Sequence, residues 1–188
     1  DGKLLGTIGL ADELRANAKE SILKLRKLGV KNIIMLTGDV KEKAEKIGIE
    51  LGVDEVRAEL LPKDKADIVK ELMAQGKKVA FVGDGINDAP ALISAHVGIS
   101  MSRGADIAKA TADISLLKDD IACVVEAKEY ANKTMSLINT NFNATVGINS
   151  GILLGATFGL FSPIVTAVLH NGTTIGLLLN SIKGVKLK

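Results

Sequence analysis

The feature of this sequence that most restricts its fold is a long run without charge. No Asp, Glu, Lys or Arg occurs between Lys133 and Lys183, whereas every Asp, Glu and Arg of the chain lies before Thr134. A charged side chain at the centre of a bilayer costs about 2.5–3.5 kcal/mol on insertion scales, and a helix needs about 20 apolar residues to cross. The run is long enough for two crossings, so it predicts a membrane-embedded segment.

A turn divides the run near its middle, where Ser162 and Pro163 interrupt the apolar pattern. We therefore expect a hairpin of two transmembrane helices, at Asn141–Phe161 and Ile164–Ile182. Lysines flank both ends of the hairpin, and by the positive-inside rule both ends face the cytoplasm. The alternative is a buried helical hairpin in a soluble core, which so long an uncharged run disfavours.

Composition excludes several other classes of protein. The formal net charge of +2 and the aromatic content of 3% argue against nucleic-acid binding, because neither a basic surface nor base-stacking platforms are indicated. The single cysteine, Cys123, excludes an internal disulfide and a CxxC metal site. The chain begins directly on the strand-like pattern "DGKLLGTIGLAD", as if it continued a longer one.

The charged part of the chain alternates short apolar, β-rich runs with helical patterns. We expect strands over residues 4–11, 32–39, 78–84, 97–101 and 113–117, and helices over 15–29, 41–52, 62–76, 87–95 and 104–112. Strands that alternate with helices predict an α/β fold, with a parallel sheet covered by helices on both faces. Ligands of such sheets bind beyond the carboxyl ends of the strands.

Polar residues follow two of the expected strands where each ends. Thr37, Gly38 and Asp39 come after one strand, and Gly83-Asp84-Gly85 comes after another. Lys65 begins a helix and is able to reach the same edge. Taken singly, a TGD turn or a solvated lysine is ordinary. Their order and placement together favour a binding site.

The residue types at this edge suit Mg²⁺ and a phosphoryl group. The carboxylates of Asp84 and Asp88 and the amide of Asn87 are hard oxygen ligands of the kind that Mg²⁺ takes. Thr37 offers a hydroxyl to a phosphate oxygen, and Lys65 offers a positive charge to a transferring phosphoryl group.

A covalent route would also need a nucleophile, often an aspartate. Asp1 has no strand before it, and Asp12 has no phosphate-binding residues beside it, so the sequence offers no convincing nucleophile.

Five segments make the sequence resemble a known family. "MLTGD", "AELLPKDKADIVKEL", "VAFVGDGINDAPAL", "VGISM" and "DISLL" are similar, in order and spacing, to the later part of the phosphorylation domain of P-type ATPases, and most of all to the heavy-metal-translocating (P1B) branch. "LADELR" and "LLLNSIK" agree with that branch, so the resemblance covers essentially the whole chain.

The resemblance implies a domain organisation. It implies a haloacid-dehalogenase-like, Rossmann-type domain at residues 1–120 and a connecting amphipathic helix at 121–140. Two transmembrane helices at 141–182 and a basic cytoplasmic tail at 183–188 would follow. The whole would be a multi-pass protein of the cell membrane, with its phosphorylation domain in the cytoplasm.

The resemblance also implies roles. Asp84 would coordinate Mg²⁺, Thr37 and Lys65 would contact an aspartyl-phosphate, and Asn87 and Asp88 would organise that site. The activity would be ATP-driven export of a metal cation. The sequence has no DKTGT motif and no match to the family's nucleotide-binding domain. We therefore expect the chain to be inactive alone and to need those N-terminal parts as partners, whether it is a fragment, a truncated product or one piece of a split transporter.

The uncharged run contains candidate ligands for the transported ion. It has no Cys, and its last Met is Met135, so it gives no support for a soft Cu(I) site. A histidine beside amides and hydroxyls suits a borderline or harder divalent ion, and "LHNGTT" lies where the metal-transporting branch has a transport-site motif. His170 and Asn171 are therefore candidate ligands. Alternatively, these polar side chains hydrogen-bond a neighbouring helix. Zinc, cobalt, manganese and cadmium all stay open.

Two other functions compete with this one. A stand-alone haloacid-dehalogenase-type phosphatase would need an upstream Asp-x-Asp motif and no membrane tail. The sequence lacks that motif and has the predicted membrane tail. A non-enzymatic, membrane-anchored partner of a split transporter would need only the fold and the hairpin.

Overall fold

The computed structural model describes residues 14, 15, 17–83, 86–101 and 110–184. The chain divides into two compact units, residues 1–126 and 127–188. Each unit is described by itself below.

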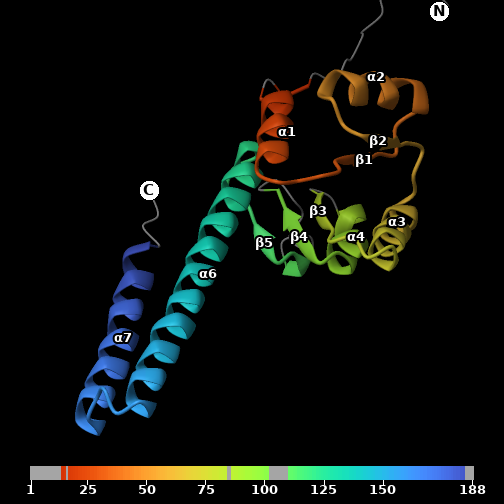
Figure 1. The fold of residues 1–188 in the computed structure, drawn as a ribbon. Helices are drawn as coiled ribbons and strands as arrows, with labels where there is room; N and C mark the ends of the chain where they lie inside the picture. The colour runs from red at the N-terminus through yellow and green to blue at the C-terminus, as the bar shows by residue number, and fades with distance from the viewer. Residues whose placement is uncertain (1–13, 16, 84–85, 102–109, 185–188) are drawn as a thin grey trace, which may run out of the picture. The chain divides into compact units, whose positions relative to one another are not determined.

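The first unit alternates strands and helices (Figure 1). Its described elements are α1 (Ala18–Lys27), β1 (Ile34–Leu36), α2 (Lys41–Leu51), β2 (Glu55–Arg57), α3 (Pro62–Ala74), β3 (Ala80–Gly83), the 3-10 turn η1 (Ile86–Asp88), α4 (Ala89–Ser94), β4 (Val97–Ser100) and β5 (Ile114–Ser115).

Most of the expected elements are confirmed. Each described strand and helix of the first unit except β2 falls within or at the edge of a range expected from the pattern. The expected strand at 4–11 lies outside the described residues, as does most of the expected helix at 104–112. The strand β2 was not expected, because its three residues are flanked by acidic side chains and show no apolar run.

All described strand pairs are parallel, as expected, but the expectation of one sheet is not met in the described residues. β1 pairs with β2, with Met35 opposite Val56, in a two-stranded sheet. β3, β4 and β5 form a second, three-stranded sheet in that order. The sheet is divided because β1 pairs with β2, a short strand that the apolar pattern does not reveal.

Two apolar clusters form the core of this unit. The first joins α3, β3 and α4 through Ala66, Val69, Phe81, Ala91 and Leu92, with Leu36 of β1 packed against it. The second surrounds β4 and the start of α6 and consists of Ile99, Met101, Leu116 and Val124. Burial of the Val, Leu, Ile, Phe and Met side chains contributes about 1.5–3 kcal/mol each, so the two clusters hold the strand ends that carry the polar residues.

The start of α3 is defined by its own sequence. Pro62 occupies the first helical turn, where its missing N–H costs nothing. Asp64 accepts a hydrogen bond from the Leu61 N–H at 2.8 Å, which satisfies a donor that the helix leaves open. This cap places Lys65 in the first turn of the helix.

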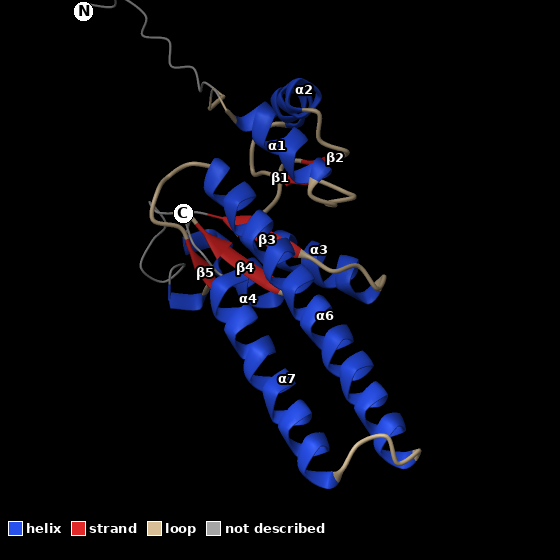
Figure 2. Cartoon of the chain, turned by 60° about the vertical axis from the view of Figure 1, so that its left-hand side comes forward, coloured by secondary structure: helices blue, strands red, loops and turns tan. Residues whose placement is uncertain are grey.

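The second unit is a helical hairpin (Figure 2). The helix α6 (Ala122–Thr157) begins in the first unit and continues without a break through the expected boundary at residue 141. A turn at residues 158–162 leads to α7 (Pro163–Gly184). Gly159 has φ +72°, and the ring of Phe161 lies so close to Gly155 that an added Cβ there would meet it at 2.3 Å. The expected break near Ser162 and Pro163 is therefore confirmed.

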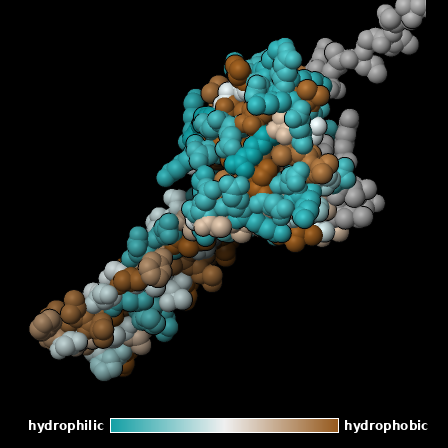
Figure 3. Space-filling model, turned by 90° about the vertical axis from the view of Figure 1, so that its right-hand side faces the viewer, coloured by the Kyte–Doolittle hydropathy of each residue, from teal (hydrophilic) through white to brown (hydrophobic). Residues whose placement is uncertain are grey.

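The hairpin exposes many large apolar side chains, among them Phe142, Leu153 and Ile164. Figure 3 shows hydrophobic side chains interleaved with more polar ones on the face of the hairpin that it draws. Judged by hydropathy, no helix among the described residues combines the length and the apolar character needed to cross a membrane. The two expected spans thus stay a prediction.

Candidate phosphate site and hairpin polar pairs

A buried ion pair links two of the predicted site residues. Lys65 Nζ donates a hydrogen bond to Asp88 Oδ1 at 2.8 Å, and the two side chains are only 17% and 11% exposed. Lys65 comes from the first turn of α3 and Asp88 from the end of η1, which are 23 residues apart in sequence. The contact confirms that the α3 lysine reaches the carboxyl end of β3.

Gly83 makes this arrangement sterically possible. A Cβ at this position would lie 2.7 Å from the Asp88 Cβ and 3.0 Å from its Cγ, closer than side chains tolerate. Glycine as the last residue of β3 therefore lets the carboxylate of Asp88 lie directly against the strand end.

The second predicted cluster forms a tight polar turn after β1. Thr37 Oγ1 donates to Asp39 Oδ2 at 2.9 Å and accepts from the Asp39 N–H at 3.1 Å. The Thr37 N–H bonds to the Arg57 carbonyl of β2, and the Leu60 N–H bonds to the Thr37 carbonyl. Gly38 belongs here because a Cβ would lie 3.3 Å from the Leu60 carbonyl oxygen. β2 and the residues after it thus hold the turn in place.

The two polar groups are attached to one core. Ala66, the residue after Lys65, belongs to the first apolar cluster. Leu36, the residue before Thr37, packs against that cluster. Asn87 lies in η1 and is exposed. Asp84 lies outside the described residues. The structure therefore joins Lys65 to Asp88 and Thr37 to Asp39, and each pair has a sequence neighbour in contact with the same apolar cluster.

The described residues fit Mg²⁺ only in part. Asp88 is a hard oxygen donor, but its Oδ1 already accepts from the Lys65 ammonium. Among the described residues, no group of three or more His, Cys, Asp or Glu side chains could hold a metal ion. The pairing favours a role for Asp88 in holding Lys65, and Asp84, the other predicted Mg²⁺ ligand, lies outside the described residues.

Polar side chains join the helices of the hairpin at two places. His170 Nδ1 lies 3.1 Å from Asn149 Oδ1. Farther along, Asn141 Nδ2 donates to Ser181 Oγ at 2.7 Å and Asn141 Oδ1 accepts from Asn180 Nδ2 at 2.8 Å. Asn171, the other predicted ligand, is exposed next to His170. The packing role foreseen for the asparagines is thus seen at residues 141 and 180.

Residues at the start of α6 form a further cluster that the sequence did not reveal. Asn17 donates to Asp120 Oδ1 at 2.6 Å, the Ala122 N–H donates to the same oxygen at 2.8 Å, and Arg15 pairs with Asp119 at 3.1 Å. The Ala122 N–H and the Asn17 amide hold the pKa of Asp120 below its ordinary value. A partner about 100 residues distant gives no signal in the local pattern.

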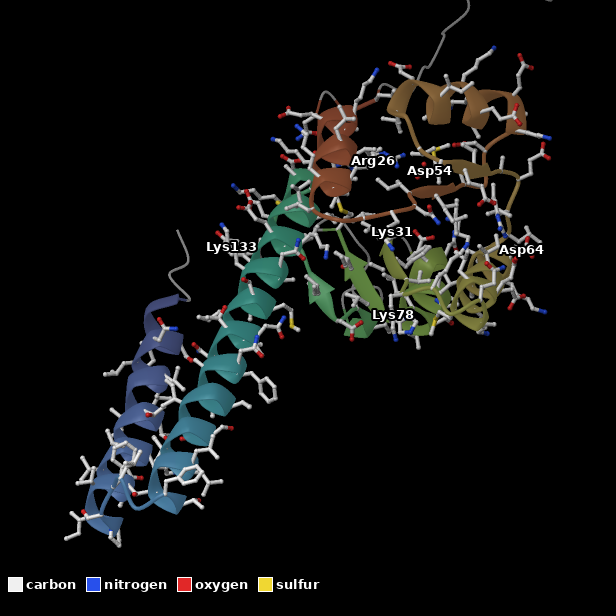
Figure 4. The ribbon with its side chains drawn as sticks, in the orientation of Figure 1. Arg26, Lys31, Asp54, Asp64, Lys78 and Lys133 are labelled. Carbon is white, nitrogen blue, oxygen red and sulfur yellow. The ribbon has the colours of Figure 1, made fainter. Side chains whose placement is uncertain are left out.

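A similar tie connects α1 to the segment before β2. Arg26 lies 2.9 Å from Asp54 Oδ1, and the Ile33 N–H donates to Asp54 Oδ2 at 2.7 Å (Figure 4). The Ile33 N–H, followed by Arg26, lowers the pKa of the Asp54 carboxyl. Asp54, directly before β2, thus ties this segment to α1 and to the residue that precedes β1.

The α/β fold has parallel strands and carries a lysine–aspartate pair at a strand that ends in glycine. The family of haloacid dehalogenase-like hydrolases matches residues 1–96, and the chain belongs to it.

The similarity to particular proteins extends over the whole chain. It is 41% identical over 190 aligned residues to a zinc-exporting P-type ATPase of Mycobacterium marinum and 40% identical to a manganese-exporting P-type ATPase of Mycobacterium leprae, covering 100% of this chain and 26% of each relative. The crystal structure of a zinc-transporting PIB-type ATPase in the E2.Pi state superposes with a TM-score of 0.84 at 36% identity, over 93% of this chain and 28% of that one.

These matches confirm the predicted resemblance to heavy-metal P-type ATPases. The chain spans about a quarter of the length of the curated relatives it matches.

Proposed function

We propose that the chain works as part of an ATP-driven exporter of a divalent heavy-metal cation, in which it supplies one side of the aspartyl-phosphate site and two membrane helices. The observation that carries this proposal is the Lys65–Asp88 pair at the Gly83 end of β3. It is supported by similarity to metal-exporting P-type ATPases over the whole chain.

In this proposal Lys65 is the cationic contact of the phosphoryl group. Asp88 holds the ammonium at the strand end, where its charge offsets the negative charge of the phosphoryl oxygens. Thr37 binds a phosphoryl oxygen when its hydroxyl proton, which Asp39 Oδ2 accepts in this structure, turns toward that oxygen. Gly38 lets the turn lie close to the Leu60 carbonyl oxygen. Mg²⁺, held by Asp84, would neutralise phosphoryl charge as a Lewis acid when bound. Asn87 and Asp88 organise the site.

The nucleophilic aspartate and the ATP-binding residues must come from outside these 188 residues, since the sequence has no DKTGT motif. The 188-residue chain by itself would then form no phosphoenzyme.

We further propose that the hairpin from about Asn141 to Ile182 lies in the cell membrane, in a multi-pass arrangement with lipid around it. Support comes from the absence of charge between Lys133 and Lys183 and from the exposed apolar side chains of the hairpin. The asparagines and His170 reduce the mean hydropathy of both helices, and polar residues of this kind are tolerated in membranes where they bond across helices.

The cargo would be a divalent cation that accepts nitrogen and oxygen ligands, with His170 and Asn171 as candidate ligands. Related proteins named for zinc and for manganese are about equally similar to this chain, so similarity does not choose between these ions.

A chimera tests the function. The matching quarter of the zinc-exporting ATPase of M. marinum is replaced by this chain, and the protein is incubated with radiolabelled ATP and with zinc or manganese. We expect metal-dependent, acid-stable and hydroxylamine-labile labelling, because the chain completes the phosphate site.

A matched lysine pair provides the control. Lys65→Met in the chimera should abolish labelling. Lys63→Met changes an exposed lysine two residues earlier and should leave labelling unchanged. A folded chimera that takes no label with either metal would contradict the proposal. Labelling of the 188-residue chain alone would show that its nucleophile lies within it.

A further inference from the structure

We propose that Asn149 is a positioning residue that fixes the tautomer of His170, so that Nε2 is the atom offered to the cation. The inference rests on the proposed function, which makes His170 a candidate ligand. It adds the partner of that ligand and the ligating atom, neither of which follows from the motif around His170.

The contact between the two side chains is the first support. Asn149 on α6 and His170 on α7 are 21 residues apart, and the Asn149 carbonyl oxygen lies 3.1 Å from His170 Nδ1. An amide carbonyl only accepts, so Nδ1 must carry the proton and donate it. In the neutral ring Nε2 then has a free lone pair, which is the form that binds a metal. Outer partners of this kind commonly orient ligating histidines.

The surroundings of His170 are the second support. The histidine lines an open groove near the hairpin turn, together with Ala156, Phe161, Pro163, Thr166 and Ala167. In the described hairpin no hydrogen bond occupies Nε2, whereas Nδ1 is held by Asn149. The bonded nitrogen thus faces α6, and the other one is left for a ligand.

The other asparagine cluster of the hairpin, around Asn141, offers no such histidine nitrogen to a ligand. Asn141 uses its nitrogen toward Ser181 and its oxygen toward Asn180, and Ser181 Oγ in turn donates to the Leu177 carbonyl. These bonds join α6 to α7, and the Asn141 amide has a partner at both its nitrogen and its oxygen. In the Asn149–His170 pair the lone pair of His170 Nε2 is left unused. The pair therefore suits a divalent cation of borderline character.

Nitrogen NMR of the intact chain tests the tautomer directly. The chain has two histidines, and His96 serves as an internal reference, because its Nδ1 accepts from the Val79 N–H at 3.2 Å and Nε2 must carry its proton. In detergent micelles at pH 8, with ¹⁵N-labelled histidine and no metal, we expect opposite tautomers for His170 and His96. A His170 ring protonated at Nε2 would overturn the inference without touching the proposed function.

Variants then connect the tautomer to the cation. Asn149→Leu should mix the His170 tautomers and weaken Zn²⁺ binding, followed at the His170 Nε2 resonance, by about 10–100-fold. Asn149→Gln keeps an amide carbonyl and should restore much of both. Asn143→Leu removes an exposed amide from the same helix and should change neither.

The outcomes separate the two proposals. Unchanged Zn²⁺ binding and tautomer in Asn149→Leu would overturn the positioning role alone. Failure of wild-type His170 to respond to either Zn²⁺ or Mn²⁺ would overturn the cation site and, with it, this inference.

Discussion

Replacing Lys65 by methionine should leave Asp88 as a nearly buried carboxylate without its counter-charge. The two charged atoms are 2.8 Å apart, and the side chains are 17% and 11% exposed. Methionine keeps most of the volume of the lysine stem, so packing against the core changes little. The effect on the free energy of unfolding should therefore report mainly the lost charge.

The size of the effect follows from the geometry. At an effective dielectric constant of 20, two unit charges at this distance attract by about 6 kcal/mol, and desolvation of both groups offsets most of that. Removing one partner of a buried pair costs about 3–5 kcal/mol. Because both side chains keep some exposure and Asp88 has a further interaction besides Lys65, we expect a loss of about 2–3 kcal/mol.

The measurement is urea unfolding of the full chain in detergent micelles at pH 7, followed by far-ultraviolet circular dichroism. Asp88→Asn should cost less than Lys65→Met, because the freed lysine can extend its long stem toward water. The double variant should recover part of the loss, with a coupling energy of at least about 1 kcal/mol.

Additive single and double variants would refute the reasoning, since independent residues show no coupling. A Lys65→Met protein as stable as Lys63→Met would refute it as well, because position 63 is exposed and carries no buried partner.

Two further predictions test the fold. Gly98→Ala should destabilise the chain by about 2 kcal/mol, because its Cβ would lie 2.7 Å from the Leu92 carbonyl oxygen. Gly147→Ala in α6 meets nothing within 4 Å and should gain up to about 1 kcal/mol of helix propensity. Equal urea midpoints for the two variants would contradict the packing. The pKa of Asp54 is lowered by the Ile33 N–H and Arg26, so its contribution is present above about pH 4 and is lost as the pH falls through the folded-state pKa. Asp54→Asn should therefore make the urea midpoint less sensitive to pH between 5 and 3, and parallel profiles for the two proteins would exclude this role.

The sequence was most informative where the pattern is local. Pro62 and the apolar positions of α3 mark a helix at 62–76 in any context, and the helix is found at Pro62–Ala74. Ser162 and Pro163 divide the uncharged run, and the helices end and begin there. Five segments, one of which contains Gly83 and Asp88, identified the family by their order and spacing.

Long-range pairing was beyond such patterns. The strand β2 has three residues, and it is a strand only because β1 offers it parallel hydrogen bonds. The roles of Asn17 and Arg15 at the start of α6 depend on aspartates about 100 residues later. Local propensity carries no information about such partners.

The sequence by itself determined the order of strands and helices, the uncharged hairpin and the family, because each depends on periodicity, on composition or on the spacing of neighbouring residues. The tertiary structure decided which of the predicted residues meet. Lys65 closes on Asp88 because α3 and α4 pack on one core, and Asn149 meets His170 because the turn at residues 158–162 brings α7 back along α6. Contacts between elements depend on how the chain returns on itself, and only the folded chain contains that information.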